Sequence, residues 1–157
     1  MPNQPRILTA RDIMSRKGVV VHPEMNLFRA IPLLLKSNLT GLPVVDSGGK
    51  LLGILSELDC MKVIASDAFN HDETNADVIV ADYMTSNCVS VTPEMGIFRI
   101  ANIFFEHTLR RLPVLDGEHL IGQVTRADVL KGIQRMRGTN GPRKQYPDFA
   151  WKSSVLQ

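Results

Sequence analysis

The chain carries the same sequence pattern twice, and this internal repeat limits its fold more than any other feature. A shift of 70 residues aligns residues 12–46 with residues 82–116, and 14 of these 35 aligned positions are identical. A one-residue gap in the next turn changes the shift to 69, so that residues 53–59 align with residues 122–128. Since each copy is one supersecondary unit, we expect two similar units that pack against each other.

Within each copy the hydrophobic period changes in the same order, from strand to helix to hairpin to helix. Residues 19–21 and 89–91 are short runs of β-branched residues, which are typical of strands. Apolar residues at helical spacing follow: Leu27, Phe28, Ile31, Leu34 and Leu35 in one copy, and Ile97, Phe98, Ala101, Phe104 and Phe105 in the other. After a predicted hairpin, closing helices begin at Ser56 and Thr125. The predicted fold class is therefore α/β (α+β), built from two β-α-β-β-α repeats.

The repeats divide the chain into four segments. We assign residues 7–65 to the first repeat, 66–77 to a polar linker, 78–136 to the second repeat and 137–157 to a C-terminal tail. The tail mixes basic and aromatic residues, as segments that bind single-stranded nucleic acid do, and it holds the single tryptophan of the chain. An exposed group of this kind is unusual for a free tail, so we expect the tail to dock onto its own or a second subunit; nucleic acid, a protein partner or disorder are the alternatives.

Charge and hydropathy narrow the range of partners. The net charge of the chain is +2, but residues 135–157 hold five basic residues and one acid, which leaves the rest at −2. A nearly neutral body argues against duplex nucleic acid, which is bound by neutralising many phosphates. The apolar runs are far shorter than the roughly 20 residues of a membrane span, and we find no secretion signal. Two cysteines far apart in apolar runs fit a reducing compartment, so we expect a cytoplasmic protein.

Three motifs recur in the same order in both copies. They are Asp-x-Met-[Ser/Thr] at residues 12 and 82, Leu-Pro-Val-[Val/Leu]-Asp at residues 42 and 112, and Gly-x-x-[Ser/Thr]-x-x-Asp at residues 53 and 122. On these motifs, residues 10–135 resemble a tandem pair of CBS domains, the cystathionine β-synthase repeat, in the arrangement called a Bateman module. The resemblance implies pseudo-two-fold symmetry and two clefts that often bind AMP, ADP, ATP or S-adenosylmethionine. It also implies assembly into a disc-like homodimer.

The same resemblance assigns residues to each cleft, since each combines the [Ser/Thr]-x-x-Asp end of one repeat with the Pro-Val strand of the other. Cleft one would contain Ser56, Glu57, Asp59, Cys88, Val89, Arg110, Arg111, Leu112 and Pro113. Cleft two would contain Gly18, Val19, Thr40, Gly41, Leu42, Pro43, Thr125 and Asp128. The arginine pair suits phosphate oxygens, so cleft one is the better candidate for an anionic nucleotide. Cleft two lacks that pair, although Arg16, Lys17 or Arg126 could replace it.

The two aspartates have an alternative interpretation that involves no ligand. Ser56 with Asp59, and Thr125 with Asp128, each place a hydroxyl at a helix start and a carboxylate one turn later, as an ordinary capping box does. In similar proteins the carboxylate instead accepts the ribose hydroxyls, while the helix N-terminus favours phosphate. The sequence leaves both possibilities open.

Catalytic signatures are weak. The segment 48–50, Gly-Gly-Lys, lacks P-loop spacing, and His71-Asp72-Glu73 has no second cluster that would complete a metal site. The chain is therefore predicted to be no enzyme and to need no cofactor or metal. We expect it to bind an adenosine-type ligand and to communicate that binding to an unknown protein partner in trans. The alternative is a scaffold without a ligand that acts through its tail on a protein or on single-stranded RNA.

Overall fold

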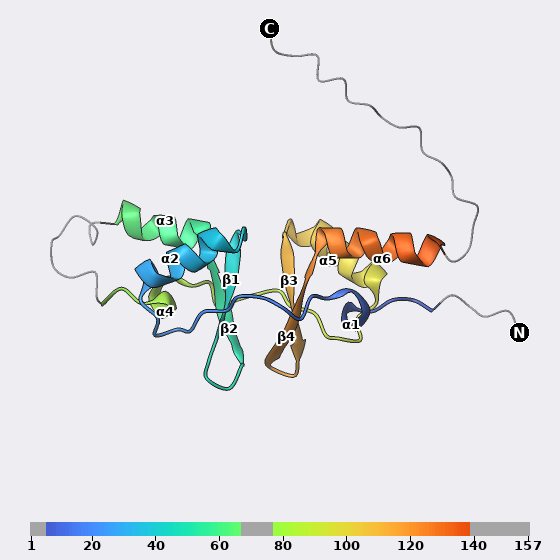
Figure 1. The fold of residues 1–157 in the computed structure, drawn as a ribbon, viewed down its shortest axis with the longest axis horizontal. Coiled ribbons are helices and arrows are strands. Elements are labelled where there is room, and N and C mark those ends of the chain that lie inside the picture. The colour runs from blue at the N-terminus through green and yellow to red at the C-terminus, as the bar shows by residue number, and fades with distance from the viewer. Residues whose placement is uncertain (1–5, 67–76, 139–157) are drawn as a thin grey trace, which may run out of the picture.

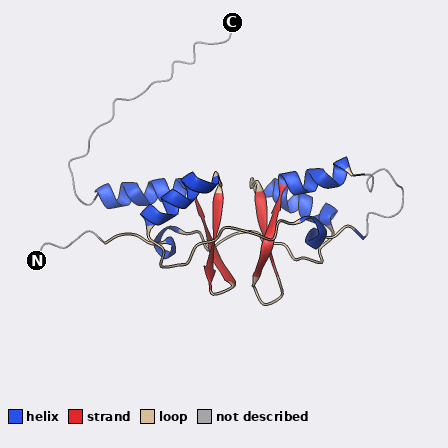
Figure 2. Ribbon diagram, turned by 180° about the vertical axis from the view of Figure 1, so that it is seen from behind, coloured by secondary structure: helices blue, strands red, loops and turns tan. Residues whose placement is uncertain are grey.

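Two similar halves stand side by side about a pseudo-two-fold axis (Figure 1). The computed structural model describes residues 6–66 and 77–138. Residues 67–76 of the predicted linker and the predicted tail from residue 139 onward lie outside the described residues. Helices lie on the outer sides of the two halves, and the strands face the centre (Figure 2).

Both copies repeat the predicted order of helix, hairpin and helix after a short opening helix that was not predicted, and the mixed α/β fold class is confirmed. The first copy contains α1 (Ala10–Ile13), α2 (Leu27–Lys36), β1 (Gly41–Val45), β2 (Leu51–Ser56) and α3 (Glu57–Ala65). The second contains α4 (Val80–Tyr83), α5 (Ile97–His107), β3 (Arg111–Asp116), β4 (His119–Thr125) and α6 (Arg126–Gly138). β1 pairs with β2 and β3 with β4, both antiparallel.

The first strand of each copy is shorter than predicted. Only Val21 and Val91 pair with the hairpins, as single parallel bridges to Val44 and Val114. The Val21 N–H donates to the Pro43 carbonyl at 3.0 Å, and the Val21 carbonyl accepts from the Val45 N–H at 3.0 Å. A proline two residues further on offers no N–H, so the ladder does not continue.

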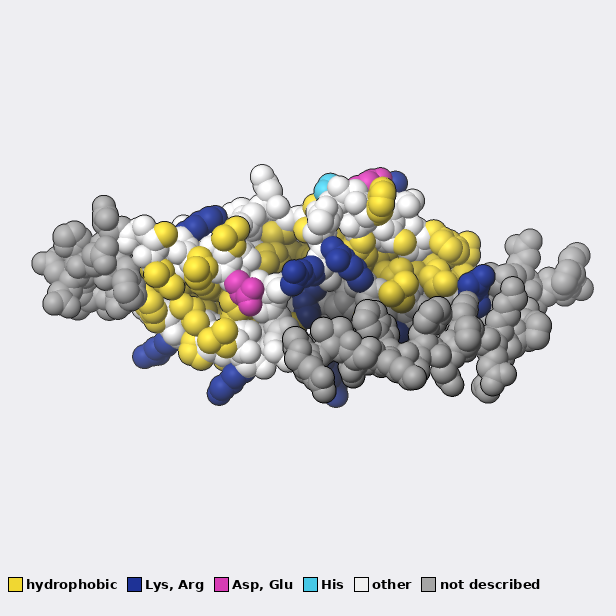
Figure 3. Space-filling model, turned by 90° about the horizontal axis from the view of Figure 1, so that it is seen from above, with side chains coloured by type: hydrophobic (Ala, Val, Ile, Leu, Met, Phe, Trp, Pro, Cys, Tyr) yellow, Lys and Arg dark blue, Asp and Glu magenta, His cyan; other side chains and the backbone are white. Residues whose placement is uncertain are grey.

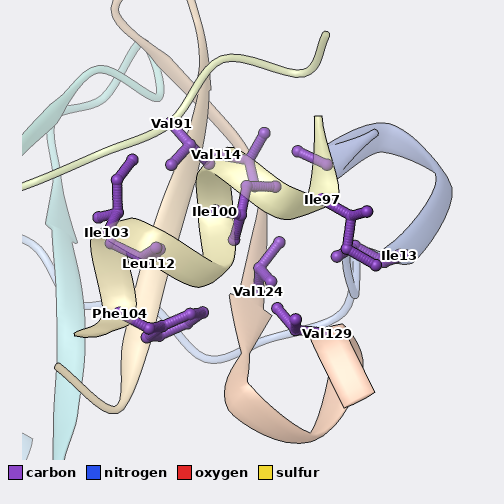
Figure 4. Packing of buried hydrophobic residues seen from close by; sticks show 11 residues of the cluster. Ile13, Val91, Ile97, Ile100, Ile103, Phe104, Leu112, Val114, Val124 and Val129 are labelled. Carbon is purple, nitrogen blue, oxygen red and sulfur yellow. The ribbon is translucent and has the colours of Figure 1, made fainter. Parts of the chain in front are cut away.

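The short helix that opens each repeat, α1 or α4, packs on the opposite half. Ile13 of α1 lies beside Ile97 and Val129 in the core of the second copy (Figure 4). Val80 of α4 correspondingly belongs to the core of the first copy, and its N–H donates to the Met25 carbonyl at 2.9 Å. Each core is therefore completed by residues from the other repeat, so the two halves are tied together by exchanged segments.

The hairpin tips are joined at one end of the molecule. The Leu51 N–H donates to the Glu118 carbonyl and the Leu120 N–H to the Gly49 carbonyl, each at 3.0 Å. An exposed ion pair joins Lys50 to Glu118 at 3.2 Å. At the opposite end, β1 and β3 begin and β2 and β4 run into helices. Among the described residues, no backbone hydrogen bond joins one hairpin to the other at that end.

Two glycines allow the exchanged segments to cross the hairpins. A Cβ on Gly53 would lie 2.6 Å from the Thr85 carbonyl oxygen, and a Cβ on Gly122 would lie 2.9 Å from that of Ser15. The crossings are held by paired backbone hydrogen bonds, Ile54 with Thr85 and Gln123 with Ser15. A side chain at either glycine would push these backbones apart.

We expect Gly53→Ala and Gly122→Ala to lower the free energy of unfolding by about 1–3 kcal/mol each, because a methyl group must displace backbone atoms. Gly138→Ala is the matched control, since nothing lies within 4 Å of its Cβ position. Urea unfolding monitored by circular dichroism measures all three. Equal stability of the Gly53, Gly122 and Gly138 variants would contradict the close crossing.

Candidate functional site

Cleft one opens between the two halves at the end where β1 and β3 begin. It has a volume of about 320 Å³ and more apolar than polar wall. It is lined by Thr40, Gly41, Pro43, Ile54, Ser56, Thr85, Asn87, Cys88, Val89, Thr108, Leu109, Arg110, Arg111, Pro113 and Gln123. Lys and Arg side chains gather at the middle of this end of the molecule, between two apolar areas (Figure 3).

Cleft two is related to cleft one by the internal repeat. It has a volume of about 240 Å³ and is lined by Ser15, Lys17, Gly18, Val19, Ser37, Leu39, Arg111, Gln123 and Thr125. Most of these positions align with residues of cleft one: Lys17 with Asn87, Gly18 with Cys88, and Thr125 with Ser56. The pseudo-symmetry thus produces two clefts of related shape and different chemistry.

The structure brings most of the residues assigned to cleft one together. Ser56, Cys88, Val89, Arg110, Arg111 and Pro113 all line it. Glu57 is exposed at the first turn of α3, and its N–H donates to the Thr40 carbonyl at 3.0 Å. Asp59 and Leu112 are buried and lie outside the lining, Leu112 in the core of the second copy.

The residues assigned to cleft two are divided between the clefts. Gly18, Val19 and Thr125 line it. Thr40, Gly41 and Pro43 line cleft one instead, because β1 and β3 begin side by side and both strand ends border the larger cleft. Leu42 is fully buried in the core of the first copy, and Asp128 lies outside the lining.

Several cleft residues lie outside the two sets that were assigned to the clefts from the sequence. Thr85 and Asn87 line cleft one, and Ser15 and Lys17 line cleft two. All four lie on the exchanged segments just after α1 and α4. Because Ser15 aligns with Thr85 and Lys17 with Asn87, the repeat alignment could have indicated them. Lys17, one of three cations considered for cleft two, does line it. Arg126 is engaged elsewhere, since its Nε donates to the Leu109 carbonyl at 2.7 Å.

Arg111 and Gln123 form a side-chain pair that borders both clefts. Nη1 of Arg111 donates to Oε1 of Gln123 at 3.3 Å, and Gln123 is 9% exposed. Burial lowers the pKa of the Arg111 guanidinium, while the Asp128 carboxylate opposes this shift. The aligned residues of the first copy are Gly41 and Ile54, which cannot form such a pair. The arginine is therefore a half-buried cation placed between the two clefts.

The two aspartates adopt the capping geometry. Oδ2 of Asp59 accepts from the Ser56 N–H at 2.9 Å and from its hydroxyl at 2.8 Å, and Lys62 Nζ donates to Oδ1 at 3.1 Å. Oδ2 of Asp128 accepts from the Thr125 N–H at 2.8 Å and from its hydroxyl at 2.9 Å. A role in holding ribose stays a prediction, and it would require these oxygens to exchange or share partners.

Cys88 is an apolar part of the cleft wall. Its Sγ donates to the Thr85 carbonyl at 3.3 Å, and burial raises the pKa of the thiol. A protonated thiol is a poor nucleophile at neutral pH. Among residues 6–66 and 77–138, no group of three His, Cys, Asp or Glu side chains is placed to hold a metal ion. No helix in these same ranges is long and apolar enough to cross a bilayer.

Two aligned repeats with two related clefts define a paired-repeat architecture. The family model of the CBS domain matches residues 10–66 and 80–135. The chain belongs to the CBS-domain family and carries the domain twice, which confirms the resemblance found in the sequence.

Related chains carry this pair either almost alone or within larger proteins. An uncharacterized protein of Methanocaldococcus jannaschii, MJ1426, is 32% identical over 155 residues, covering 81% of this chain and 92% of that protein. A homoserine O-acetyltransferase of Methanosphaera stadtmanae is 30% identical over 120 residues, which cover 76% of this chain but 23% of the enzyme. The match therefore spans only a part of that enzyme.

Solved structures of similar chains contain adenosine compounds. The crystal structure of CBSX2 in complex with AMP has a TM-score of 0.71 and 29% identity, covering 83% of this chain and 98% of that chain; CBSX2 is from Arabidopsis thaliana. The CBS domain pair of MJ0100 in complex with 5′-methylthioadenosine and S-adenosyl-L-methionine has a TM-score of 0.64 and 26% identity, covering 87% of this chain and 100% of that one.

We expect Asp59→Ala to lower the free energy of unfolding by about 1–2 kcal/mol without any ligand, because the Ser56 N–H and hydroxyl lose their acceptor. Glu57→Gln is the control, since it removes a carboxylate from the same helical turn and leaves the capping box intact. Denaturant unfolding of the ligand-free protein makes the comparison. Unchanged stability of the Asp59 variant would leave the buried carboxylate without a structural role and favour the ligand interpretation.

Proposed function

We propose that this protein is a regulatory module that binds an adenosine-containing ligand, with AMP as the first candidate among AMP, ADP, ATP and S-adenosylmethionine. The observation that carries the proposal is cleft one, which combines apolar walls from both repeats with an arginine pair at one side. An apolar slot beside fixed cations suits a flat base joined to a phosphate.

The lining of the cleft combines three kinds of side chain. Ile54, Val89 and Pro113 provide apolar wall, and Arg110 and Arg111 provide cationic donors. Hydroxyls of Thr40, Ser56, Thr85 and Thr108 also line the cleft and are suitable partners for ribose. The AMP complex of CBSX2 and the S-adenosyl-L-methionine complex of the MJ0100 pair support a ligand of this class.

A regulatory role follows from the position of the cleft between the repeats. A ligand there would contact β1 and the strand start of β3 together, and so would bind best at one separation of the two halves. Binding shifts a conformational equilibrium only through such differential affinity. The proposed output acts on a protein partner, and the chain itself catalyses no reaction.

We expect Arg110→Ala to weaken AMP binding about tenfold and to leave adenosine binding unchanged, because the exposed guanidinium borders cleft one only and reaches phosphate alone. Arg99→Ala is the matched control: it removes the same charge from an exposed position on α5 outside both clefts. Isothermal titration calorimetry with AMP and adenosine measures both effects.

Two outcomes of this titration would count against the proposal. An equal loss of AMP affinity in the Arg99 variant would indicate that AMP binding depends only on the net charge of the protein. Absence of binding for AMP, ADP, ATP and S-adenosylmethionine would remove the nucleotide function and favour a scaffold.

We also propose a homodimer that covers the apolar helical faces. Leu35 and Phe105 occupy aligned positions and are 68% and 89% exposed, and the aligned pair Met61 and Leu130 are 58% and 69% exposed. Figure 3 shows apolar areas on each side of the basic centre. A second copy with the same pseudo-two-fold pattern offers a matching surface.

We expect Leu130→Glu to shift the protein from dimer to monomer, because a charge would be placed in an apolar interface. Lys131→Gln, at the next exposed position, changes the net charge by the same amount and should leave the dimer intact. Sedimentation velocity over a concentration series measures the shift. A wild-type monomer at all concentrations would refute the dimer.

A further inference from the structure

One cation is shared by both clefts. Arg111 is the one Lys or Arg, among the described residues, that lines cleft one and cleft two together, and Gln123 is the other side chain common to both linings. The remaining cations are separate, since Arg110 borders cleft one and Lys17 borders cleft two.

The position of Arg111 is fixed by its surroundings. Its guanidinium donates to Gln123 at 3.3 Å, and the backbone of Gln123 is paired with Ser15 in both directions, at 2.9 and 3.0 Å. Its own strand position faces Thr125 across the hairpin. The cation is thus held on the second repeat between the two cavities, and the first repeat offers only Gly41 at the aligned position.

We propose that Arg111 couples the two clefts, so that a phosphate-bearing ligand in one cleft weakens the binding of a second such ligand in the other. This inference rests on the proposed nucleotide function. Two phosphates that approach one guanidinium from opposite clefts share a single positive charge, and their own negative charges repel each other. Ligands without phosphate do not compete for the guanidinium and should bind independently.

The test compares AMP binding by variants in which one cleft is blocked with AMP binding by the wild type, in which both clefts are open. Gly18→Trp fills cleft two and Cys88→Trp fills cleft one, at aligned positions of the repeat. Gly18 has no positive φ and its Cβ position meets only the Gln123 side chain at 3.6 Å, so the backbone there accepts a Cβ without strain. If Cys88→Trp fails to fold, Asn87→Trp at an exposed position of the same cleft replaces it.

Titration calorimetry with AMP gives an association constant for each blocked variant and two for the wild type. Coupling predicts that the product of the two wild-type constants falls about tenfold or more below the product of the blocked-variant constants, within the usual range of allosteric coupling. With adenosine the two products should agree. In the Arg111→Met background, which keeps an apolar stem and removes the charge, the difference with AMP should disappear.

The outcomes separate this inference from the proposed function. Equal products with AMP, or AMP binding by only one of the blocked variants, would overturn the coupling and leave a nucleotide-binding protein. A difference that persists in Arg111→Met would assign the coupling to another group and also overturn the role of Arg111. No AMP binding by the wild type or either blocked variant would refute the nucleotide function, and the coupling with it.

Discussion

The exchange of segments between the repeats is the interaction on which the rest of the structure depends. Each half has a two-stranded sheet extended by one bridge, and its core is completed by a short helix from the other repeat. The exchange also positions the chain after those helices. Residues 15–18 pass β4 and residues 85–88 pass β2, and each forms one wall of a cleft. The packing that holds the halves together therefore also forms the clefts.

The pseudo-symmetry of the backbone is broken by side chains at the clefts. Gly41 and Ile54 on the first repeat leave space, whereas Arg111 and Gln123 on the second fill the aligned positions. One cleft is larger and more apolar, and the other is smaller and bordered by Lys17 and Arg111. Duplication thus supplies the architecture, and divergence at a few strand ends gives each cleft its own chemistry.

The parts that the sequence predicts well are those fixed by local patterns. The repeat, the helical faces, the hairpins and the capping geometry of Asp59 and Asp128 all follow from periodicity and short-range spacing. The exchange of α1 and α4 could not be predicted, because a helix of four residues with one or two buried side chains is too short for its pattern to show which core it joins. The placement of Thr40 and Gly41 in cleft one was missed as well, because it depends on which strand starts lie side by side. The first strands fell short at their N-terminal side, where Val19 and Val89 line the clefts and do not pair with a hairpin.

The joined hairpin tips determine how a bound ligand could affect the molecular surface. Backbone hydrogen bonds hold residues 49–51 against residues 118–120, whereas the strand starts at the other end carry the clefts. A change in the separation of the halves would be smallest at the tips and largest at the clefts. α3 and α6 begin there, directly after Ser56 and Thr125, and they carry the exposed Met61 and Leu130. A ligand that sets the width of the open end would therefore also set the angle between the apolar faces that a second copy would cover.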